Sequence, residues 1–162
     1  MAAMPEGAIP RTGLGFDVHR FSEDRPLWLG GVRFEGEDGL LGHSDGDVVC
    51  HAIADALLGA AALGDLGQHF PDTDPDYAGI EGGALLRRVV DLLGGVGFLP
   101  TSTDVTVVCD RPAIAPRRDE MRQELASCLG LTLDRVSVKA TRPEGLGLAG
   151  DGVGCLAVAV IV

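Results

Sequence analysis

Several short segments of the chain alternate hydrophobic and polar residues, and this period of two predicts β-strands. The pattern predicts strands in residues 13–19, 27–34, 103–109, 135–141 and 154–162. The second segment contains a Gly-Gly dipeptide typical of a hairpin turn, and the acidic, glycine-rich stretch after it, Glu35 to Leu41, predicts a loop. The last segment is hydrophobic almost throughout, as in a strand that is buried on both faces.

Three longer segments space their hydrophobic residues at helical intervals, and they predict helices over residues 47–63, 81–96 and 115–129. Ser44 is predicted to cap the first helix, with Asp47 three residues later in a position like that of a capping box, and Gly64 is predicted to end it. Residues 67–79 contain two prolines and no hydrophobic period, so they predict a surface loop, and loops of this length often carry function.

Strands and helices are interspersed along the chain, which favours an α+β fold in which a β-sheet packs on helices. The length of 162 residues, 46% of them hydrophobic, suffices for one domain. We expect a flexible extension over residues 1–12 and a single domain over residues 13–162.

The formal net charge of −11 indicates that neither nucleic acid nor an anionic membrane is the partner, because both attract positively charged surfaces. An anionic substrate would need local neutralisation, for example by metal ions. Charged residues and glycines interrupt each hydrophobic run before it could span a bilayer, and the start of the chain lacks the pattern of a signal peptide. A cytoplasmic location is therefore expected.

The four cysteines are widely separated and form no paired motif. Cys50, Cys109, Cys128 and Cys155 lie in hydrophobic surroundings, where cysteine commonly behaves as a small core residue. They are predicted to be reduced structural thiols, and a zinc-thiolate site is not expected.

Three residues in the first third of the chain have the side chains of a catalytic zinc site. The period of a strand places Asp17 and His19 on one face, and His51 in the following helix would add a second imidazole. Asp47 or Asp55, each four residues from His51, could accept the second ring N–H, and Asp55 is favoured. The alternative is that both histidines are solvated or bonded to neighbouring acids, since D-x-H is a common tripeptide.

A second group of polar residues could contact a substrate. His43 and Ser44 lie at the predicted helix start, where free N–H groups favour an anion, although Ser44 could equally act only as a cap. Asp65, Asp72 and Asp74 flank the predicted loop and are either ordinary turn residues or ligands of substrate hydroxyls.

The chain also contains three motifs in a fixed order: GFDVH at residues 15–19, GHSDGDVVCHAIADALLGAAALGDLG at residues 42–67, and FPDTDP at residues 70–75. On these motifs the sequence resembles the 2-C-methyl-D-erythritol 2,4-cyclodiphosphate synthase family of non-mevalonate isoprenoid biosynthesis. The resemblance extends from Gly13 to Val162. So long an ordered match is highly specific.

The resemblance implies a metal-dependent phosphorus-oxygen lyase. Members of the family convert 4-diphosphocytidyl-2-C-methyl-D-erythritol 2-phosphate to the cyclic diphosphate and release CMP. The resemblance further implies a homotrimer with active sites between subunits. It implies Zn²⁺, or another divalent transition metal, at the positions of Asp17, His19 and His51, and Mg²⁺ or Mn²⁺ bridging the substrate diphosphate.

Carried over position by position, the resemblance assigns catalytic roles to His43 and Arg142. The residues that it implies for substrate binding fall at the metal site and its loops, after the third predicted strand and after the fourth: Asp17, Val18, His19, His43, Ser44, Asp65, Leu66, Gly67, Phe70, Pro71, Asp72, Thr73, Asp74, Cys109, Asp110, Arg111, Pro112, Ala113, Ile114, Ala115, Thr141, Arg142, Pro143 and Glu144.

The chain departs from the family pattern near the implied nucleotide site and near its end. Arg142 replaces a hydroxyl residue of the family, and Ala113 replaces a lysine. We hypothesise that Arg142 restores the missing positive charge beside the nucleotide phosphates. Asp151 and Val153 replace an arginine and a glutamate that lie toward the family's trimer axis, so no ligand on that axis is expected.

Two other classes of function remain open at this point. One is a different zinc enzyme acting on a phosphorylated metabolite, which would release inorganic phosphate or no nucleotide. The other is a trimeric binding module that keeps zinc and binds cytidine nucleotides without turnover.

Overall fold

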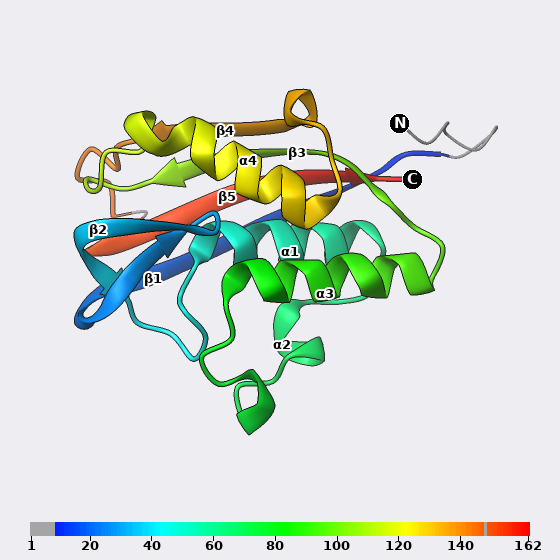
Figure 1. Ribbon diagram of the computed structural model, residues 1–162, viewed down its shortest axis with the longest axis horizontal. Helices are drawn as coiled ribbons and strands as arrows, with labels where there is room; N and C mark the ends of the chain where they lie inside the picture. The colour runs from blue at the N-terminus through cyan, green and yellow to red at the C-terminus, as the bar shows by residue number, and fades with distance from the viewer. Residues whose placement is uncertain (1–8, 148) are drawn as a thin grey trace.

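A five-stranded sheet with the strand order β2-β1-β5-β3-β4 forms one layer of the protein (Figure 1). The computed structural model describes residues 9–147 and 149–162. Neighbouring strands are antiparallel except for β3 and β4, which are parallel. The strands are β1 (Arg11–Leu29), β2 (Val32–Leu40), β3 (Pro100–Val108), β4 (Val136–Thr141) and β5 (Gly152–Ile161).

The helices gather on one side of the sheet, with α1 and α3 side by side and α4 in front of β3 and β4 (Figure 1). The α-helices are α1 (Val48–Ala60), α2 (Leu66–His69), α3 (Gly82–Gly95) and α4 (Arg118–Leu129). Short 3₁₀ turns are η1 (Pro75–Tyr77), η2 (Ala115–Arg117) and η3 (Leu133–Arg135). These elements confirm the predicted α+β single domain and the three predicted long helices.

Helix α1 lies directly on β1 because two glycines leave room for its backbone. A Cβ atom at Gly13 would lie 1.8 Å from the carbonyl oxygen of Ala56, and one at Gly15 would lie 1.9 Å from that of Ala52. No side chain fits at such distances. The side chains of α1 are therefore buried on nearly every face, between the sheet and α3.

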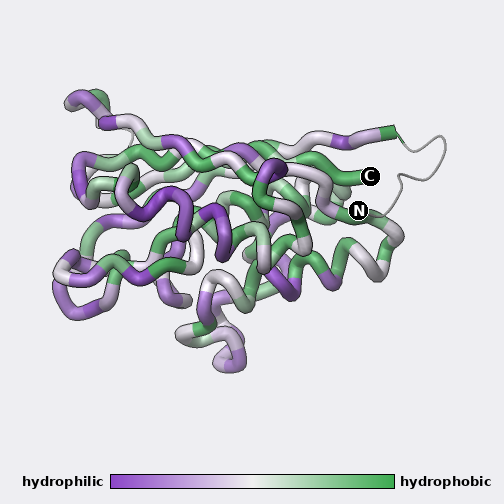
Figure 2. The backbone as a smooth tube through the Cα atoms, turned by 45° about the horizontal axis from the view of Figure 1, so that its top comes forward, coloured by the Kyte–Doolittle hydropathy of each residue, from purple (hydrophilic) through white to green (hydrophobic). Residues whose placement is uncertain are grey.

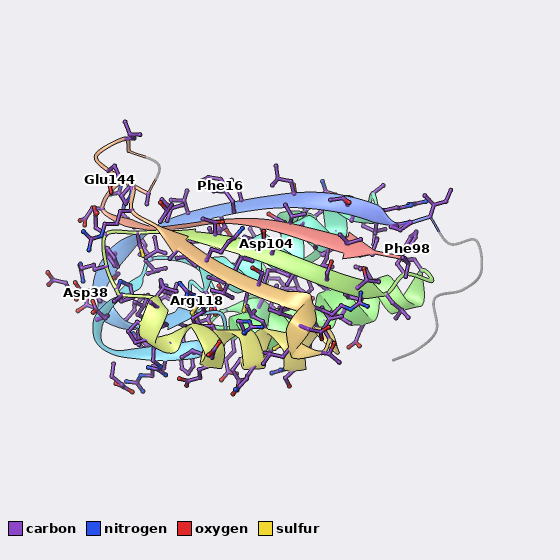
Figure 3. All side chains as sticks on the ribbon, turned by 90° about the horizontal axis from the view of Figure 1, so that it is seen from above. Phe16, Asp38, Phe98, Asp104, Arg118 and Glu144 are labelled. Atoms are coloured by element: carbon purple, nitrogen blue, oxygen red, sulfur yellow. The ribbon has the colours of Figure 1, made fainter. Side chains whose placement is uncertain are left out.

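The opposite face of the sheet carries no helix, and Figure 3 shows β1, β5, β3 and β4 side by side with α1 and α3 behind them. Large hydrophobic side chains are exposed on this face: Leu14, Phe16, Val18, Leu156 and Val158. They alternate along β1 and β5 with residues that face the helices. Figure 2 shows the hydrophobic colour along the C-terminal strand. The prediction that this strand is buried on both faces holds only for the face toward the helices, since Leu156 and Val158 are exposed on the other.

Some local predictions were wrong: α1 ends at Ala60 rather than at Gly64, and the predicted loop over residues 67–79 contains most of α2 and the η1 turn. The predicted loop over residues 35–41 lies mostly within β2, which extends to Leu40. Residues 38–40 pair with Pro26, Ser22 and Phe21 of β1 despite the polar side chains. Ser44 does not cap α1. Asp47 is the N-cap, and its carboxylate accepts hydrogen bonds from the backbone N–H groups of Val49 and Cys50.

The first strand begins at Arg11 rather than Gly13, because Arg11 and Thr12 already pair with Ile161 and Val160 of β5. Residues 1–8 of the predicted flexible extension lie outside the described residues. In the part of the chain that the structure describes, no helix combines the length and the hydrophobicity needed to cross a membrane.

Candidate metal centre and substrate cavity

The three predicted metal ligands lie together where β1 passes the start of α1. One ligand atom each from Asp17, His19 and His51 lies within 4.8 Å of the others. Oδ2 of Asp17 is 3.1 Å from Nε2 of His19 and 3.1 Å from Nδ1 of His51. The strand period places Asp17 and His19 on one face as predicted, and the close packing of α1 on β1 brings His51 to them.

Each histidine is held by an oxygen at its other ring nitrogen. His19 Nδ1 contacts the carbonyl oxygen of Leu41, and His51 Nε2 lies 3.0 Å from Oγ of Ser44. With those nitrogens protonated as donors, the two remaining ring nitrogens are left as ligands beside the Asp17 carboxylate. Two imidazoles, one carboxylate and oriented outer partners fit a catalytic zinc ion.

The predicted partners of His51 have other roles, so that prediction was wrong. Asp55 accepts a hydrogen bond of 2.8 Å from the backbone N–H of Leu66. Asp47, besides capping α1, accepts from the N–H groups of the hairpin glycines Gly30 and Gly31 at 2.8 and 2.7 Å. The helix turns both carboxylates toward backbone donors that the sequence alone does not reveal as neighbours.

Without a bound metal, the hydrogen bonds within the cluster shift the pKa values of Asp17 and His19. Burial alone would raise the pKa of Asp17, but hydrogen bonds and positive charge from His19 and His51 outweigh burial and lower that pKa well below its usual range. The hydrogen bond from Asp17 raises the pKa of His19, against the effect of burial. The carboxylate is therefore ionised over the whole physiological pH range.

A cavity of about 490 Å³ opens over the metal cluster. Beyond the three ligands, it is lined by these predicted site residues: His43, Ser44, Leu66, Gly67, Phe70 and Asp72. Sequence reasoning missed a hydrophobic part of the lining made by Tyr77, Ile80 and Leu85. The helical period marked Leu85 as buried, but no sequence signal directed it or Tyr77 toward the site.

His43 and Ser44 occupy the cavity rim as predicted, but not for the reason predicted. The first N–H groups of α1 are bonded to Asp47, so they are not free to receive a phosphate. His43 is exposed, whereas Ser44 is buried and bonded to His51. Any anion here would meet the His43 side chain and the metal cluster rather than the helix N-terminus.

The three predicted aspartates separate into two roles in this chain. Asp65 caps α2 by accepting from the N–H of Gln68 at 3.1 Å, and Asp74 caps η1 by accepting from the N–H of Asp76 at 3.0 Å. Asp72 lines the cavity. Asp65 and Asp74, with Pro71 and Thr73, belong to the same α2–η1 segment but are not among the described residues that line the cavity.

The remaining predicted residues lie away from this cavity. Val18 points to the open face of the sheet, opposite to Asp17 and His19. Residues 109–115 follow β3, and Thr141 ends β4 with residues 142–144 after it, while β5 separates both strands from β1. Because β3 and β4 are parallel, with Val108 opposite Thr141, the two segments begin side by side at the carboxyl ends of these strands.

Arg111, one of these residues, already has partners within the chain. Its guanidinium donates to Asp38 at 2.8 Å and to Glu37 at 3.4 Å, and it lies 3.9 Å from the ring centre of Phe21. These contacts hold the segment after β3 against the β1–β2 hairpin, at the end away from the Gly30–Gly31 turn.

All four cysteines are free and buried, which confirms their prediction as structural thiols. Burial raises the pKa of the Cys109 thiol to about 11, so it is neutral at physiological pH.

Comparison with known proteins matches the whole described domain to one family. A sequence model of the YgbB family covers residues 10–162. The chain belongs to the YgbB family. The residues of the metal cluster and its cavity all lie inside the matched range.

Relatives of this YgbB-family chain include proteins that it matches along nearly their whole length and longer proteins that it matches in part. The 2-C-methyl-D-erythritol 2,4-cyclodiphosphate synthase of Trichlorobacter lovleyi is 51% identical over 152 residues, which are 94% of this chain and 97% of the relative. The bifunctional enzyme IspD/IspF of Anaeromyxobacter sp. (strain Fw109-5) is 57% identical over 148 residues. That match covers 91% of this chain but only 38% of the bifunctional relative.

The fold of the YgbB-family domain is also found in solved structures. A 2C-methyl-D-erythritol-2,4-cyclodiphosphate synthase, described as a form bound to CDP, superposes with a TM-score of 0.86 and 37% identity. The match covers 94% of this chain and 100% of that structure.

Proposed function

We propose that this chain converts 4-diphosphocytidyl-2-C-methyl-D-erythritol 2-phosphate to 2-C-methyl-D-erythritol 2,4-cyclodiphosphate and CMP, as a step of non-mevalonate isoprenoid biosynthesis. One observation carries the proposal: a single cavity is lined by the metal cluster of Asp17, His19 and His51 and, at its rim, by His43 and Ser44. Relatives that match along nearly their whole length bear the name of this synthase. The reaction is proposed to take place in the cytoplasm.

Asp17, His19 and His51 would hold Zn²⁺ or another divalent transition metal. When bound, such an ion polarises a phosphoryl oxygen as a Lewis acid. A second cation, Mg²⁺ or Mn²⁺, would be held mainly by the substrate diphosphate, and Glu144 is the exposed carboxylate assigned to that side. Two cations fit an acidic chain that must bind a highly anionic substrate.

The chain's own residues would bind the substrate and orient it. His43 and Ser44 would contact phosphate at the rim of the cavity. The polar groups of the α2 segment and of Asp72 would bind the erythritol hydroxyls, while Tyr77 and Leu85 would enclose the carbon skeleton. The same segment also contains Asp65, Pro71, Thr73 and Asp74, which are proposed to assist substrate binding.

The reaction then needs positioning rather than a protein nucleophile. An oxygen of the 2-phosphate forms a bond to the β-phosphorus of the diphosphate, and the bond from that phosphorus to the oxygen of CMP breaks. CMP leaves with the bonding electron pair. His43 would donate a hydrogen bond to the phosphate oxygens during this exchange.

The cytidine end of the substrate would be bound by residues 109–115 and 141–144 of a neighbouring subunit in a homotrimer. Two observations support this arrangement: those segments lie outside the cavity of their own chain, and the open sheet face exposes hydrophobic side chains that a second subunit would bury. Ala113 and Arg142 are both exposed on segments that begin side by side at the carboxyl ends of β3 and β4. Arg142 is proposed to supply the positive charge that Ala113 lacks.

Phosphorus NMR of the purified chain with substrate, Zn²⁺ and Mg²⁺ tests the proposal. CMP and the cyclic diphosphate should appear together, and a chelator should abolish both. Release of inorganic phosphate instead would identify a different zinc enzyme. Intact substrate in the presence of bound zinc and bound cytidine nucleotide would identify a binding module without turnover.

A further inference from the structure

Strand β1 contains a three-residue bulge opposite β2. Ser22 pairs with Gly39 and Pro26 pairs with Asp38, so residues 23–25 have no partner between two consecutive residues of β2. Gly39 makes room for the bulge, because a Cβ atom there would lie 2.4 Å from the carbonyl oxygen of Arg25. Such an insertion redirects the side chains of the bulged strand.

The bulge directs the Arg25 side chain to the loop that bears His43. Its Nη1 donates to the carbonyl oxygen of Gly42, and its Nη2 donates to the carbonyl oxygen of Ser44. The intervening carbonyl of His43 accepts from the N–H of Gly79 at 3.0 Å. Three successive carbonyls of the loop are therefore fixed, two of them by one guanidinium group.

This loop contacts both parts of the site. His43 lies on the cavity rim between the two carbonyls that Arg25 binds. Ser44 reaches His51 of the metal cluster through its hydroxyl. Leu41, the partner of His19, is held separately, because its N–H donates to the carbonyl oxygen of Arg20 at 2.9 Å.

We infer that Arg25 is a positioning residue for catalysis, which holds the loop of Gly42 to Ser44 so that His43 and Ser44 meet the substrate phosphate in a fixed geometry. The inference rests on the proposed function. The planar fork of arginine serves two carbonyls at once, and lysine cannot reproduce that geometry. The guanidinium also adds a positive charge close enough to His19 to affect it electrostatically.

Arg25→Met and Arg25→Lys test the inference, with Arg33→Met as a matched control. Arg33 lies on β2, pairs with Glu35 through Nε at 3.2 Å and leaves 53% of its side chain exposed. In the zinc-loaded enzyme, Arg25→Met should lower kcat/KM about 10- to 100-fold, mostly through kcat, because a small displacement of positioning groups has effects of that size. Arg25→Lys should recover only part of the loss.

Zinc affinity and chemical rescue separate positioning from general damage to the fold. The zinc Kd of Arg25→Met, measured by chelator competition, should change much less than that of Ser44→Ala, since the three ligands, the Leu41 contact and the Ser44 hydroxyl itself all remain. Guanidinium ion should restore part of the activity of Arg25→Ala. It should not affect Arg33→Ala.

Hydrogen exchange gives a readout that does not depend on turnover. Two hydrogen-bonded amides at this loop are those of Gly79, which donates to the carbonyl of His43, and of Asp45, which donates to the carbonyl of Ile80. Both should exchange at least about tenfold faster in Arg25→Met than in the wild type or in Arg33→Met. Unchanged exchange together with unchanged kcat/KM would overturn the inference. If the wild type releases no CMP, the proposed function fails, and unchanged exchange alone then overturns the role of Arg25 in holding the loop.

Discussion

The hydroxyl of Ser44 lies 3.0 Å from Nε2 of His51, so a residue of the loop proposed to contact phosphate is also the outer partner of a proposed metal ligand. Ser44→Ala should therefore weaken zinc binding and turnover together. Loss of an outer-sphere partner typically reduces metal affinity or activity about 10- to 100-fold. Chelator competition and steady-state kinetics measure the two effects. Ser22→Ala, on β1 and not among the cavity residues, serves as the control.

Asp55 should affect substrate binding without affecting zinc. Its carboxylate accepts from the N–H of Leu66 and so fixes the start of α2 beside the cavity. Asp55→Ala should raise KM about fivefold to tenfold, the effect of losing one ordinary hydrogen bond. The zinc Kd should stay within about twofold. A large loss of zinc affinity would instead indicate that Asp55 acts as the hydrogen-bond partner of His51.

The stability of the zinc-free protein should depend on pH through Asp17 and His19. The lowered pKa of Asp17 means that its contribution is present above the ordinary value of 3.8 and is lost as the pH falls. The raised pKa of His19 means that its contribution is complete below 6.5 and is lost as the pH rises through the folded-state pKa. The pair therefore stabilises the fold most between these two values.

Urea unfolding in the presence of a chelator checks this window. Asp17→Asn should reduce the free energy of unfolding by about 1 kcal/mol near pH 5.5, and by less near pH 8.5. Asp104→Asn is the control, because Asp104 pairs with Lys139 rather than with a histidine. Its effect should be the same at both pH values. An Asp17→Asn effect that grows with pH would contradict the assignment.

The open sheet face should be the contact between subunits of the proposed homotrimer. Leu156→Glu places a charge on that face, and Leu92→Glu places one on the outer side of α3, where the leucine is exposed to the same extent, 39% in both cases. Sedimentation should show that the first variant dissociates at low micromolar concentration while the second remains trimeric. The same result for both variants would exclude this face as the contact.

Arg142 and the lysine missing at Ala113 should compensate for each other. Arg142→Thr should lower kcat/KM about tenfold or more by removing a charge-assisted contact to phosphate. Adding Ala113→Lys to that variant should restore most of the loss. Steady-state kinetics with Arg118→Thr, an exposed arginine at the start of α4, provides the control. Full activity of Arg142→Thr alone would show that the charge has no role.

Local patterns were enough to predict part of every strand and the long helices. The alternation around Asp17 and His19 predicted their common face, because side-chain direction in a strand depends only on position. The second half of the metal site depended on packing: His51 is 34 residues from Asp17. Only the packing of α1 on β1 in the structure shows that His51 lies beside Asp17.

Features formed by irregular backbone were beyond local reasoning. The bulge that carries Arg25 breaks the period of two, so no pattern pointed to that residue. The pairing of residues 38–40 of β2 depends on backbone groups of β1, which polar side chains did not indicate. The partners of Asp47 and Asp55 are likewise backbone N–H groups contributed by the hairpin and by α2.

The contact of Gly13 and Gly15 with α1 makes the metal site sensitive to positions that no ligand touches. Either glycine, if replaced, would push α1 outward from β1, and His51 would move away from Asp17 with it. In a library of random substitutions screened for growth, these two glycines should tolerate no replacement, as strictly as the metal ligands themselves. The two glycines of β1 would then set the distance between the Asp17 carboxylate and the His51 imidazole.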